Sequence, residues 1–403
     1  MDWKPDGRKA YYIECDVHIN VADHDRCNDL PFFPESILID DTMVSQATKE
    51  ALTRRGVNSI PGQKKLAPNL FPKKRYKVHI AALQYYLSKG GILDKVHRVL
   101  EFEQSDWLKQ YIDFNTAKRQ QSTSEFGKAF YKLLNNAFFG KSMESVRKRV
   151  NIRLVKNGKQ HLFQTSKPGY KRFSIFSHDL VGVEIATPYI VLDKPIYIGA
   201  TILDLSKLLM YRFWYDVLKV KYDNIKLCFT DTDSFLFHAE TPDLYKDIHD
   251  MRRHFDTSNY PKDHYLYSNE NKAVPGLFKD ECGGKVISEF VGLRSKLYHV
   301  LIDDDKNPSK MAAAGVKKKI ANKYLLHEDY KNVLFGGEEV NVAQTTFRSV
   351  NHTMYSVRQS KCALSAIDSK RYILPDLVST RALRHYLNEF ELDFDISSQG
   401  SDF

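Results

Sequence analysis

The chain has 403 residues, a formal net charge of +10 at neutral pH and a sequence pI near 9.0. Hydrophobic residues make up 42% of it, with 24 Phe and 23 Tyr, which excludes an intrinsically disordered protein and allows about two or three domains. No apolar run reaches the length of a membrane span, so we expect no membrane partner.

Basic residues occur in clusters, which favours a polyanionic partner, with nucleic acid as the first candidate. A basic surface that merely keeps the protein soluble is the alternative. The clusters are Lys73, Lys74, Arg75 and Lys77; Arg147, Lys148 and Arg149; and Lys317, Lys318 and Lys319.

The five cysteines are an odd number and include no Cys-x-x-Cys motif, which argues against a disulfide framework or a zinc ribbon. A reducing intracellular compartment fits best, although the pattern does not distinguish nucleus, cytoplasm and organelle. Cys15, His18, His24 and Cys27 offer ligand types that suit zinc, but their spacing favours a strand followed by a polar loop.

Residues 1–115 predict mixed structure. We expect a strand within Ala10–Val21, a helix over Met43–Arg55, and a short strand followed by a helix over Arg75–Arg98.

A long helical pattern covers Lys118–Val150. Its apolar residues recur at helical spacing, so they form one stripe that we expect to pack on the body of the protein. These residues are Phe126, Phe130, Leu133, Leu134 and Ala137.

The other face of the same pattern carries polar groups. Lys132, Asn136 and Phe139 fall within a sector of about 60°, and Lys118 lies on that side if the helix is continuous. An ammonium, an amide and an aromatic ring on one face can contact a nucleotide, whereas a solvated polar helix face is the alternative.

The second half of the chain predicts strands and turns over residues 151–195 and an amphipathic helix over residues 201–219. A hairpin over residues 225–237 follows directly, and residues 300–403 are basic and mixed. The polar tail Ser397–Phe403 is expected to fray.

The tip of the predicted hairpin holds two carboxylates, those of Asp231 and Asp233. In an extended segment they would point to the same side, because the side-chain period is two. Mg²⁺ prefers one or two carboxylates together with substrate phosphates, so the tip suits a metal-dependent phosphoryl-transfer site. Ordinary turn chemistry is the alternative, and it is the favoured one for these residues taken alone.

Two of these elements resemble motifs of family B DNA polymerases. The run Lys132-x-x-x-Asn136-Ala137-x-Phe139-Gly140 is similar to their fingers motif, Lys-x3-Asn-Ser-x-Tyr-Gly. Residues 229–234, Phe-Thr-Asp-Thr-Asp-Ser, are similar to their palm motif, Tyr-x-Asp-Thr-Asp-Ser.

A third match is Ser295-Lys296-Leu297-Tyr298, which is similar to the Lys-x-Tyr element that contacts the primer terminus. The order of the motifs agrees with the family, and the context around residues 111–115 resembles its protein-primed branch of viruses and mobile elements most closely. The resemblance covers nearly the whole chain, most firmly residues 70–380.

The resemblance implies an α+β fold with the palm, fingers and thumb of a polymerase. Residues 1–115 would form part of the palm and an insertion, 116–150 the fingers helices, 151–300 the palm with the acidic hairpin, and 301–403 the thumb and tail. The upstream exonuclease domain of the family has no counterpart in this sequence.

The resemblance also implies roles for single residues. Asp233 would be the ligand of a two-ion Mg²⁺ site, with Asp231 as its neighbour. Lys132 would contact the triphosphate of the incoming nucleotide, and Lys118 or Arg119 would be a second cation.

Further roles concern the bases and the DNA strand. Asn136 and Phe139 would line the nascent base pair, while Lys296 and Tyr298 would hold the primer end. Contacts to primer or duplex DNA are also implied for Thr232, Ser234, Lys317 and Lys318.

The sequence departs from the family pattern in three places. Ala137 replaces the usual Ser and Phe139 the usual Tyr, which removes two hydroxyl groups near the nucleotide. The third departure concerns the first palm motif, Asp-x-x-x-Leu-Tyr-Pro, which supplies the other metal-binding Asp and is not found. Asp16 lies on a predicted strand, but no Leu-Tyr-Pro follows it, so we do not assign it that role.

The resemblance therefore implies DNA-directed DNA synthesis, with primer-template DNA and dNTP as partners and a terminal protein as a possible primer. Because one carboxylate motif is missing, we expect this chain alone to be inactive or nearly so in primer extension. The rival hypothesis is a non-catalytic, nucleic-acid-binding remnant of a viral or mobile-element polymerase.

Overall fold

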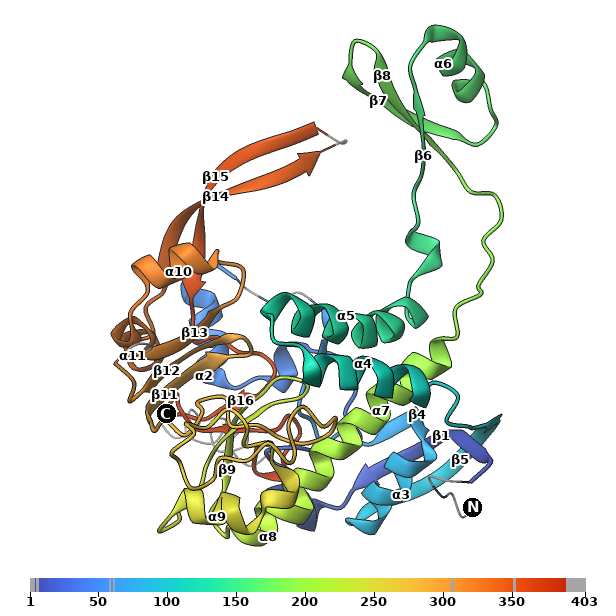
Figure 1. Cartoon of the computed structure of the whole chain (residues 1–403). Coiled ribbons are helices and arrows are strands. Elements are labelled where there is room, and N and C mark those ends of the chain that lie inside the picture. The colour runs from blue at the N-terminus through green and yellow to red at the C-terminus, as the bar shows by residue number, and fades with distance from the viewer. Residues whose placement is uncertain are drawn as a thin grey trace.

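The computed structural model describes residues 4, 7–57, 59–60, 62–305, 308–350 and 353–388. Over these residues the protein is α+β, and its sheets are small and antiparallel. Figure 1 shows a main body that carries most of the helices and strands, with two arms projecting from it. None of the helices in these ranges is long and apolar enough to cross a membrane.

The helices and strands have the following bounds. The α-helices are α1 (His24–Cys27), α2 (Gln46–Arg54), α3 (Ile80–Ser88), α4 (Lys109–Gln121), α5 (Glu125–Ser142), α6 (Gly158–Thr165), α7 (Ile196–Arg212), α8 (Lys219–Lys221), α9 (Leu244–Asp250), α10 (Lys318–Tyr324) and α11 (His327–Gly336). A π-helix, η4 (Phe213–Leu218), joins α7 to α8, and short 3-10 turns are η1 (Val21–Asp23), η2 (Asp41–Met43), η3 (Val146–Lys148) and η5 (Arg252–His254). The strands are β1 (Lys9–Ile19), β2 (Ser36–Leu38), β3 (Lys64–Leu66), β4 (Lys73–His79), β5 (Gly91–Glu103), β6 (Asn151–Val155), β7 (Tyr170–Ser177), β8 (Leu180–Ile185), β9 (Lys226–Thr230), β10 (Phe235–His238), β11 (Ile287–Arg294), β12 (Leu297–Ile302), β13 (Ser309–Ala313), β14 (Val340–Val350), β15 (Thr353–Leu364), β16 (Tyr372–Ile373) and β17 (Thr380–Arg381).

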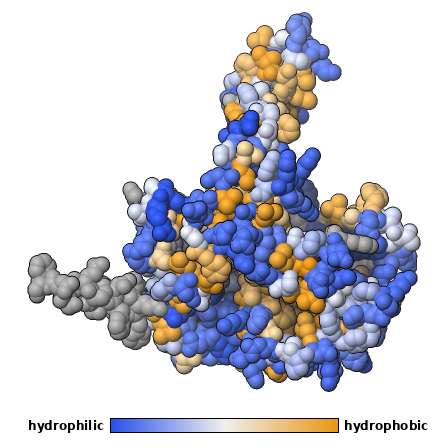
Figure 2. All heavy atoms as spheres, turned by 90° about the vertical axis from the view of Figure 1, so that its left-hand side faces the viewer, coloured by the Kyte–Doolittle hydropathy of each residue, from blue (hydrophilic) through white to orange (hydrophobic). Residues whose placement is uncertain are grey.

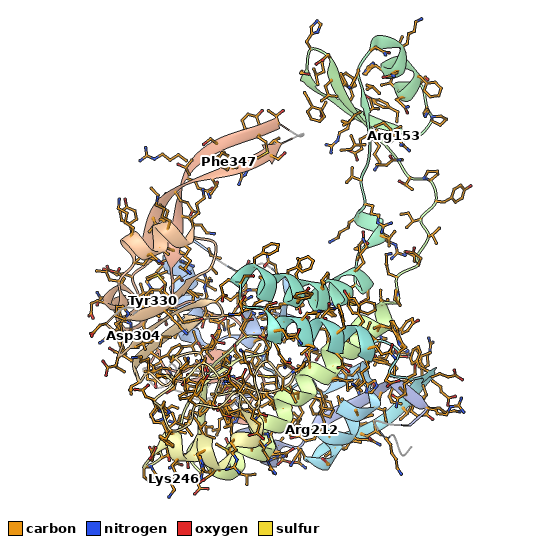
Figure 3. All side chains as sticks on the ribbon, in the orientation of Figure 1. Arg153, Arg212, Lys246, Asp304, Tyr330 and Phe347 are labelled. Atoms are coloured by element: carbon orange, nitrogen blue, oxygen red, sulfur yellow. The ribbon has the colours of Figure 1, made fainter. Side chains whose placement is uncertain are left out.

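One arm is the long ribbon β14–β15, which carries Phe347, and the other consists of β6, α6, β7 and β8, with Arg153 on β6 (Figures 1 and 3). Both arms expose apolar side chains, and Phe347 is 75% exposed. The hydrophobic residues at the top of Figure 2 belong to the second arm, whose exposed apolar side chains are Leu154, Leu162, Phe163, Phe173, Ile175 and Phe176.

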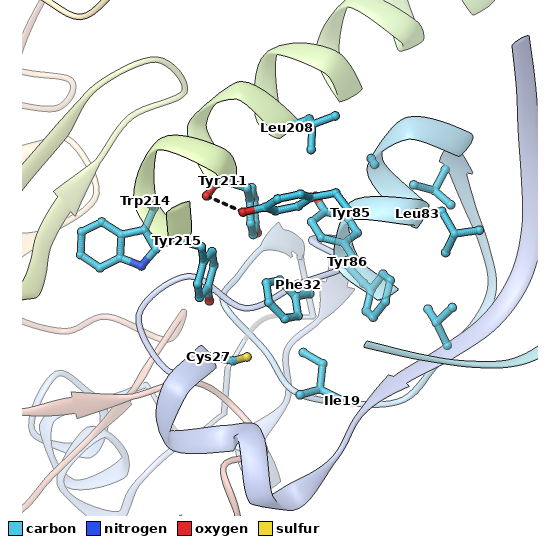
Figure 4. Packing of buried hydrophobic residues seen from close by; sticks show 14 of the residues in the cluster. Ile19, Cys27, Phe32, Leu83, Tyr85, Tyr86, Leu208, Tyr211, Trp214 and Tyr215 are labelled. Carbon is cyan, nitrogen blue, oxygen red and sulfur yellow. Dashed lines mark hydrogen bonds between the residues drawn. The ribbon is translucent and has the colours of Figure 1, made fainter. Parts of the chain in front are cut away.

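The largest core lies between the sheet β4-β1-β5, helix α3 and the α7–η4 helix. Strand β1 buries alternate residues, because one side of a strand faces the core. Figure 4 shows the aromatic centre of this core, where the Tyr85 hydroxyl donates to the Tyr211 carbonyl at 3.3 Å and Trp214 is fully buried.

The hairpin β9–β10 rests on this core. The rings of Phe235 and Trp214 lie 5.7 Å apart between centroids, and Leu227 and Phe237 also pack against the core. The backbone N–H of Leu227 donates to the Asp29 carboxylate at 3.0 Å, which fixes the start of the hairpin to the loop after α1. The strands β9 and β10, which flank the acidic tip, are therefore held firmly against the core.

Several predicted elements are confirmed. Strand β1, helix α2, the α7–η4 helix and the hairpin β9–β10 lie where the sequence predicts them. Over residues 75–98 the predicted strand and helix are present, but β5 follows them as a second strand of the same sheet. Residues 151–195 contain helix α6 in addition to the predicted strands, and the tail Ser397–Phe403 lies outside the described residues.

The condition that one helix continues from Lys118 to Lys132 is not met. Helix α4 ends at Gln121 and α5 begins at Glu125, because the Ser124 hydroxyl accepts a hydrogen bond from the Gly127 N–H and caps a new helix. The two helices pack against each other as a pair. Lys118 therefore lies on a different helix from Lys132, so helical periodicity does not place the two lysines on one face.

Candidate active site

The acidic tip is a tight turn between β9 and β10. The N–H of Asp231 donates to the Ser234 carbonyl at 3.3 Å, and the N–H of Asp233 donates to the Asp231 carbonyl at 2.6 Å. Thr232 has a φ of +59°, which a β-branched residue rarely adopts. The surrounding packing must hold the tip in this conformation.

This geometry corrects one step of the sequence argument. The period of two applies to extended backbone, whereas the left-handed Thr232 turns the chain between the two carboxylates. Asp231 is partly exposed and Asp233 is exposed. Both carboxylates are therefore accessible, but their arrangement comes from the turn and not from a strand.

The turn between β11 and β12 meets this tip. It consists of Ser295 and Lys296, and Lys296 also has a left-handed backbone, with a φ of +59°. The Lys296 ammonium lies 3.4 Å from the Asp231 carboxylate. Two motifs that are far apart in the sequence thus share one ion pair.

Aromatic packing reinforces the same junction. The ring centroids of Phe229 and Tyr298 lie 4.7 Å apart, and Phe290 also contacts Tyr298. Burial, together with the negative charge of Asp231, raises the pKa of Tyr298. The Tyr298 hydroxyl therefore stays protonated at neutral pH and can donate a hydrogen bond.

The tip fits a Mg²⁺ ion only in part. Asp231 and Asp233 are hard oxygen ligands, and Mg²⁺ commonly takes one or two carboxylates plus water and substrate phosphates. Among the described residues, however, no group of three or more His, Cys, Asp or Glu side chains is arranged to hold a metal. The two carboxylates suit a Mg²⁺ ion that is also bound by nucleotide phosphates better than one that is bound by the protein alone.

Asp16 has a structural role within the sheet β4-β1-β5. Its carboxylate accepts hydrogen bonds from the Arg75 N–H and from His97 Nε2, both at 2.8 Å, and lies 3.4 Å from the Lys74 ammonium. These donors, led by the Arg75 N–H, lower the pKa of Asp16 to about 2. Asp16 thus links β1 to both neighbouring strands.

We expect the Asp16→Asn variant to be less stable than the wild type at pH 6, because it loses a carboxylate that folding favours in its charged form. Since the pKa of Asp16 falls from 3.8 to about 2 on folding, its contribution is present above pH 3.8 and is lost as the pH falls through 2. Urea unfolding at a series of pH values measures the difference. If the difference in the free energy of unfolding between the wild type and Asp16→Asn persists unchanged below pH 2, this expectation is contradicted.

The residues that the resemblance assigns to the fingers lie on the helix pair α4–α5. Lys132 and Asn136 are exposed on α5 and Phe139 is partly buried, while Lys118 lies over the Phe114 ring and Arg119 is partly buried on α4. The Gln120 side chain donates to the Lys272 carbonyl at 2.8 Å, which ties α4 to the long loop before β11. Among the described residues, no hydrogen bond or ion pair joins Lys132 directly to the acidic tip.

The prediction that the apolar stripe of α5 packs on the body is wrong for most of its length. Phe126, Phe130 and Leu133 are 80%, 43% and 62% exposed, and the rings of Phe126 and Phe130 stack on each other. The end of α5 approaches α7, where Ser142 and the following Met143 lie close to Gly199.

The basic clusters differ in their environment. In the first, Lys73 is buried and paired with Glu35, and Lys77 lies near Glu14, so this cluster is largely neutralised. Lys317 and Lys318 are exposed at the start of α10, and the Lys317 ammonium lies 5.7 Å from the centre of the Phe347 ring.

Two of the four candidate zinc ligands, Cys15 and His18, lie on β1 as expected, whereas His24 and Cys27 are buried on the short helix α1 and not in a polar loop. Burial raises the pKa of Cys15 and of Cys27 to about 11, and His18 pairs with Asp94. Neutral, buried thiols are poor metal ligands. All five cysteines are free.

No protein-family model, curated protein or solved structure matches this chain. Its function is therefore inferred from the residues and the geometry described above.

Proposed function

We propose that this chain is part of a template-directed DNA polymerase of the family B type, with the β9–β10 tip as its catalytic centre. The observation that carries the proposal is the junction of Asp231 with Lys296 and of Phe229 with Tyr298. Two segments that resemble different motifs of the family, residues 229–234 and 295–298, therefore contact each other, as the proposal requires.

In this proposal Asp231 and Asp233 hold Mg²⁺ together with the nucleotide phosphates. When bound, the metal supplies positive charge that neutralises the phosphates and polarises the phosphorus centre. Lys296 and Tyr298 hold the primer end beside the tip. Lys132 contacts the triphosphate from α5, and Asn136 and Phe139 contact the base pair.

The reaction forms a bond between the primer 3′-oxygen and the α-phosphorus of the dNTP. The bond from that phosphorus to its bridging oxygen breaks, and pyrophosphate leaves with the electron pair. Such a transfer needs positioning and charge neutralisation more than covalent help from the protein. Two accessible carboxylates and an exposed lysine at one tip are among the groups that this chemistry requires.

One observation favours a second candidate, a non-catalytic protein that only binds nucleic acid. Phosphoryl transfer by two metal ions normally uses a further carboxylate, and the described residues show no cluster of three acidic or other metal-ligating side chains. Asp16 is the other carboxylate considered from the sequence. It already forms hydrogen bonds with Arg75 and His97 and an ion pair with Lys74.

The two candidates differ in how nucleotide affects DNA binding. We expect the wild-type chain to bind a fluorescent primer-template, and the dNTP that matches the template to slow dissociation at least tenfold, but only with Mg²⁺. Asp233→Ala should abolish this slowing and leave DNA binding without nucleotide unchanged. Fluorescence anisotropy measures both quantities.

The matched control is Glu240→Ala, which removes an exposed carboxylate just beyond the other end of the same hairpin. It should behave as the wild type does. If the nucleotide does not change the dissociation rate of the DNA from any variant, the result supports the protein that only binds nucleic acid. Efficient primer extension by the 403-residue chain would contradict our expectation that the chain alone is inactive.

A further inference from the structure

A cavity of about 630 Å³ lies between two hydrophobic cores of the protein. Helix α2 and Ile373 line one side, and Leu52 of α2 and Tyr372 belong to the core behind them. Leu334 near the end of α11 and Ala366 line the other side, and both pack against the second core. Small-molecule sites are common at interfaces between packed units and have volumes of about 300–1,000 Å³. The position and the size of this cavity therefore suit a small ligand.

Most of the cavity wall is apolar. Among the described residues that line it, Thr48 and Ser365 are the only uncharged ones with a polar side chain, and both hydroxyls already have partners. Thr48 shares a hydrogen bond with Ser45 at 3.2 Å, and Ser365 accepts one from the Ile367 N–H at 3.3 Å. The wall can therefore stabilise a ligand mainly by burying apolar surface. Its apolar side chains include Ala51, Val57, Leu334, Ile367, Ile373 and Leu377.

The charged residues of the lining leave one positive charge uncompensated. They are Arg54, Arg55 and Glu339. Arg55 forms an ion pair with Glu339 and donates to Cys362 Sγ at 3.4 Å. The guanidinium of Arg54, which lies beside Gly337 at the end of α11, forms no ion pair or hydrogen bond within the described part of the chain. An arginine binds a carboxylate through two parallel N–H···O bonds, so Arg54 is suited to a single carboxylate.

We propose that this cavity binds an amphipathic carboxylate, which is a small molecule with one carboxylate group and an apolar chain. The carboxylate pairs with Arg54, and the chain lies along the apolar wall. Its single negative charge matches the one uncompensated cation of the lining. Because the bound chain contacts both sides of the cavity, it joins α2 to α11. This proposal does not depend on the polymerase function, since none of the lining residues belongs to the acidic tip or to the α4–α5 pair.

The first test measures the affinity of the full chain for three soluble probes by isothermal titration calorimetry. Dodecanoate should bind with a stoichiometry of one. Decanoate should bind about tenfold more weakly, because each buried methylene strengthens binding about fourfold and decanoate has two fewer. Dodecanol, which has no charge, should also bind at least tenfold more weakly. An affinity that is independent of the chain length or of the carboxylate overturns the proposal.

The second test changes the cavity. Arg54→Gln should weaken the binding of dodecanoate at least tenfold and leave the binding of dodecanol unchanged. The matched control is Arg153→Gln, which removes an exposed arginine on the distant arm (Figure 3) and should have no effect. Equal weakening by the two variants overturns the proposal, because the basic surface as a whole would then attract the anion.

A further variant, Ala51→Phe, fills the cavity from α2. It should abolish the binding of both dodecanoate and dodecanol while its circular dichroism stays that of the wild type. If this folded variant binds dodecanoate as the wild type does, the ligand lies elsewhere and the proposal is overturned.

The third test locates the ligand by hydrogen exchange. Dodecanoate should slow the exchange of α2 and of residues 334–339 at least tenfold, whereas β1, which lies in another core, should not change. Unchanged exchange of α2 at saturating dodecanoate overturns the proposal.

Vesicles that contain phosphatidylserine represent another source of amphipathic anions, a lipid surface. The protein should not sediment with them at physiological salt. If it does, and if Arg54→Gln abolishes the sedimentation while soluble dodecanoate fails to bind, the site serves a membrane and the proposal is overturned.

Discussion

Replacing Trp214 with Ala should lower the free energy of unfolding by about 3–5 kcal/mol, the usual cost of truncating a fully buried Trp. Trp214 is 0% exposed and packs against Phe235 of β10, and the Lys219 ammonium lies 5.9 Å from its ring. The cavity left behind would loosen the base of the hairpin that carries Asp231 and Asp233. Urea denaturation followed by circular dichroism measures the loss.

Two variants control this experiment. Trp214→Phe keeps most of the ring volume and removes an indole N–H that has no partner among the described residues, so it should cost much less. Trp107→Ala removes an indole that is 60% exposed and should also cost little. Equal losses for Trp214→Ala and Trp107→Ala would show that the core does not depend on Trp214.

The second large effect is expected for Glu35→Ala. The Lys73 side chain is 1% exposed, and its ammonium pairs with Glu35 at 2.9 Å and donates to Asn69. Removing Glu35 leaves a buried charge with one neutral partner, which typically costs about 3–5 kcal/mol. Urea unfolding at pH 7 provides the comparison with the wild type.

The pH dependence identifies the cause of that loss. Burial lowers the pKa of Lys73 below its ordinary value of 10.5, and Glu35 opposes this effect. Without Glu35 the pKa should fall further, so the variant should regain stability as the pH rises through the folded pKa toward 10.5. The double variant Glu35→Leu with Lys73→Met should be close to the wild type.

The exposed ion pair Lys9–Glu101 offers a matched control for Glu35. Glu101→Ala should change stability far less, because water already screens that pair. If Glu101→Ala and Glu35→Ala lower stability equally, burial is not what makes the Lys73 pair important.

Local chemistry explains which predictions from the sequence are confirmed. The alternation of apolar and polar residues identifies β1. Turn-forming residues between two apolar runs identify the hairpin β9–β10. The break after α4 also had a local signal, since Ser124 is a typical N-cap.

Other features have no local signal. The amphipathic pattern of α5 predicts an apolar stripe, but it does not say whether another element covers Phe126 and Phe130. Nor does the sequence show that Lys73, within a basic cluster, is buried against Glu35. Such facts depend on which segments pack together.

The sequence by itself determined the α+β composition, the position of the acidic turn and the motifs that suggest nucleotide chemistry. Only the tertiary structure brought Lys296 to Asp231 and Tyr298 to Phe229, and only it assigned Asp16 to the sheet. The physical reason is that turn and strand preferences act between neighbouring residues, whereas ion pairs and ring contacts between distant segments depend on the packing of the core beneath them.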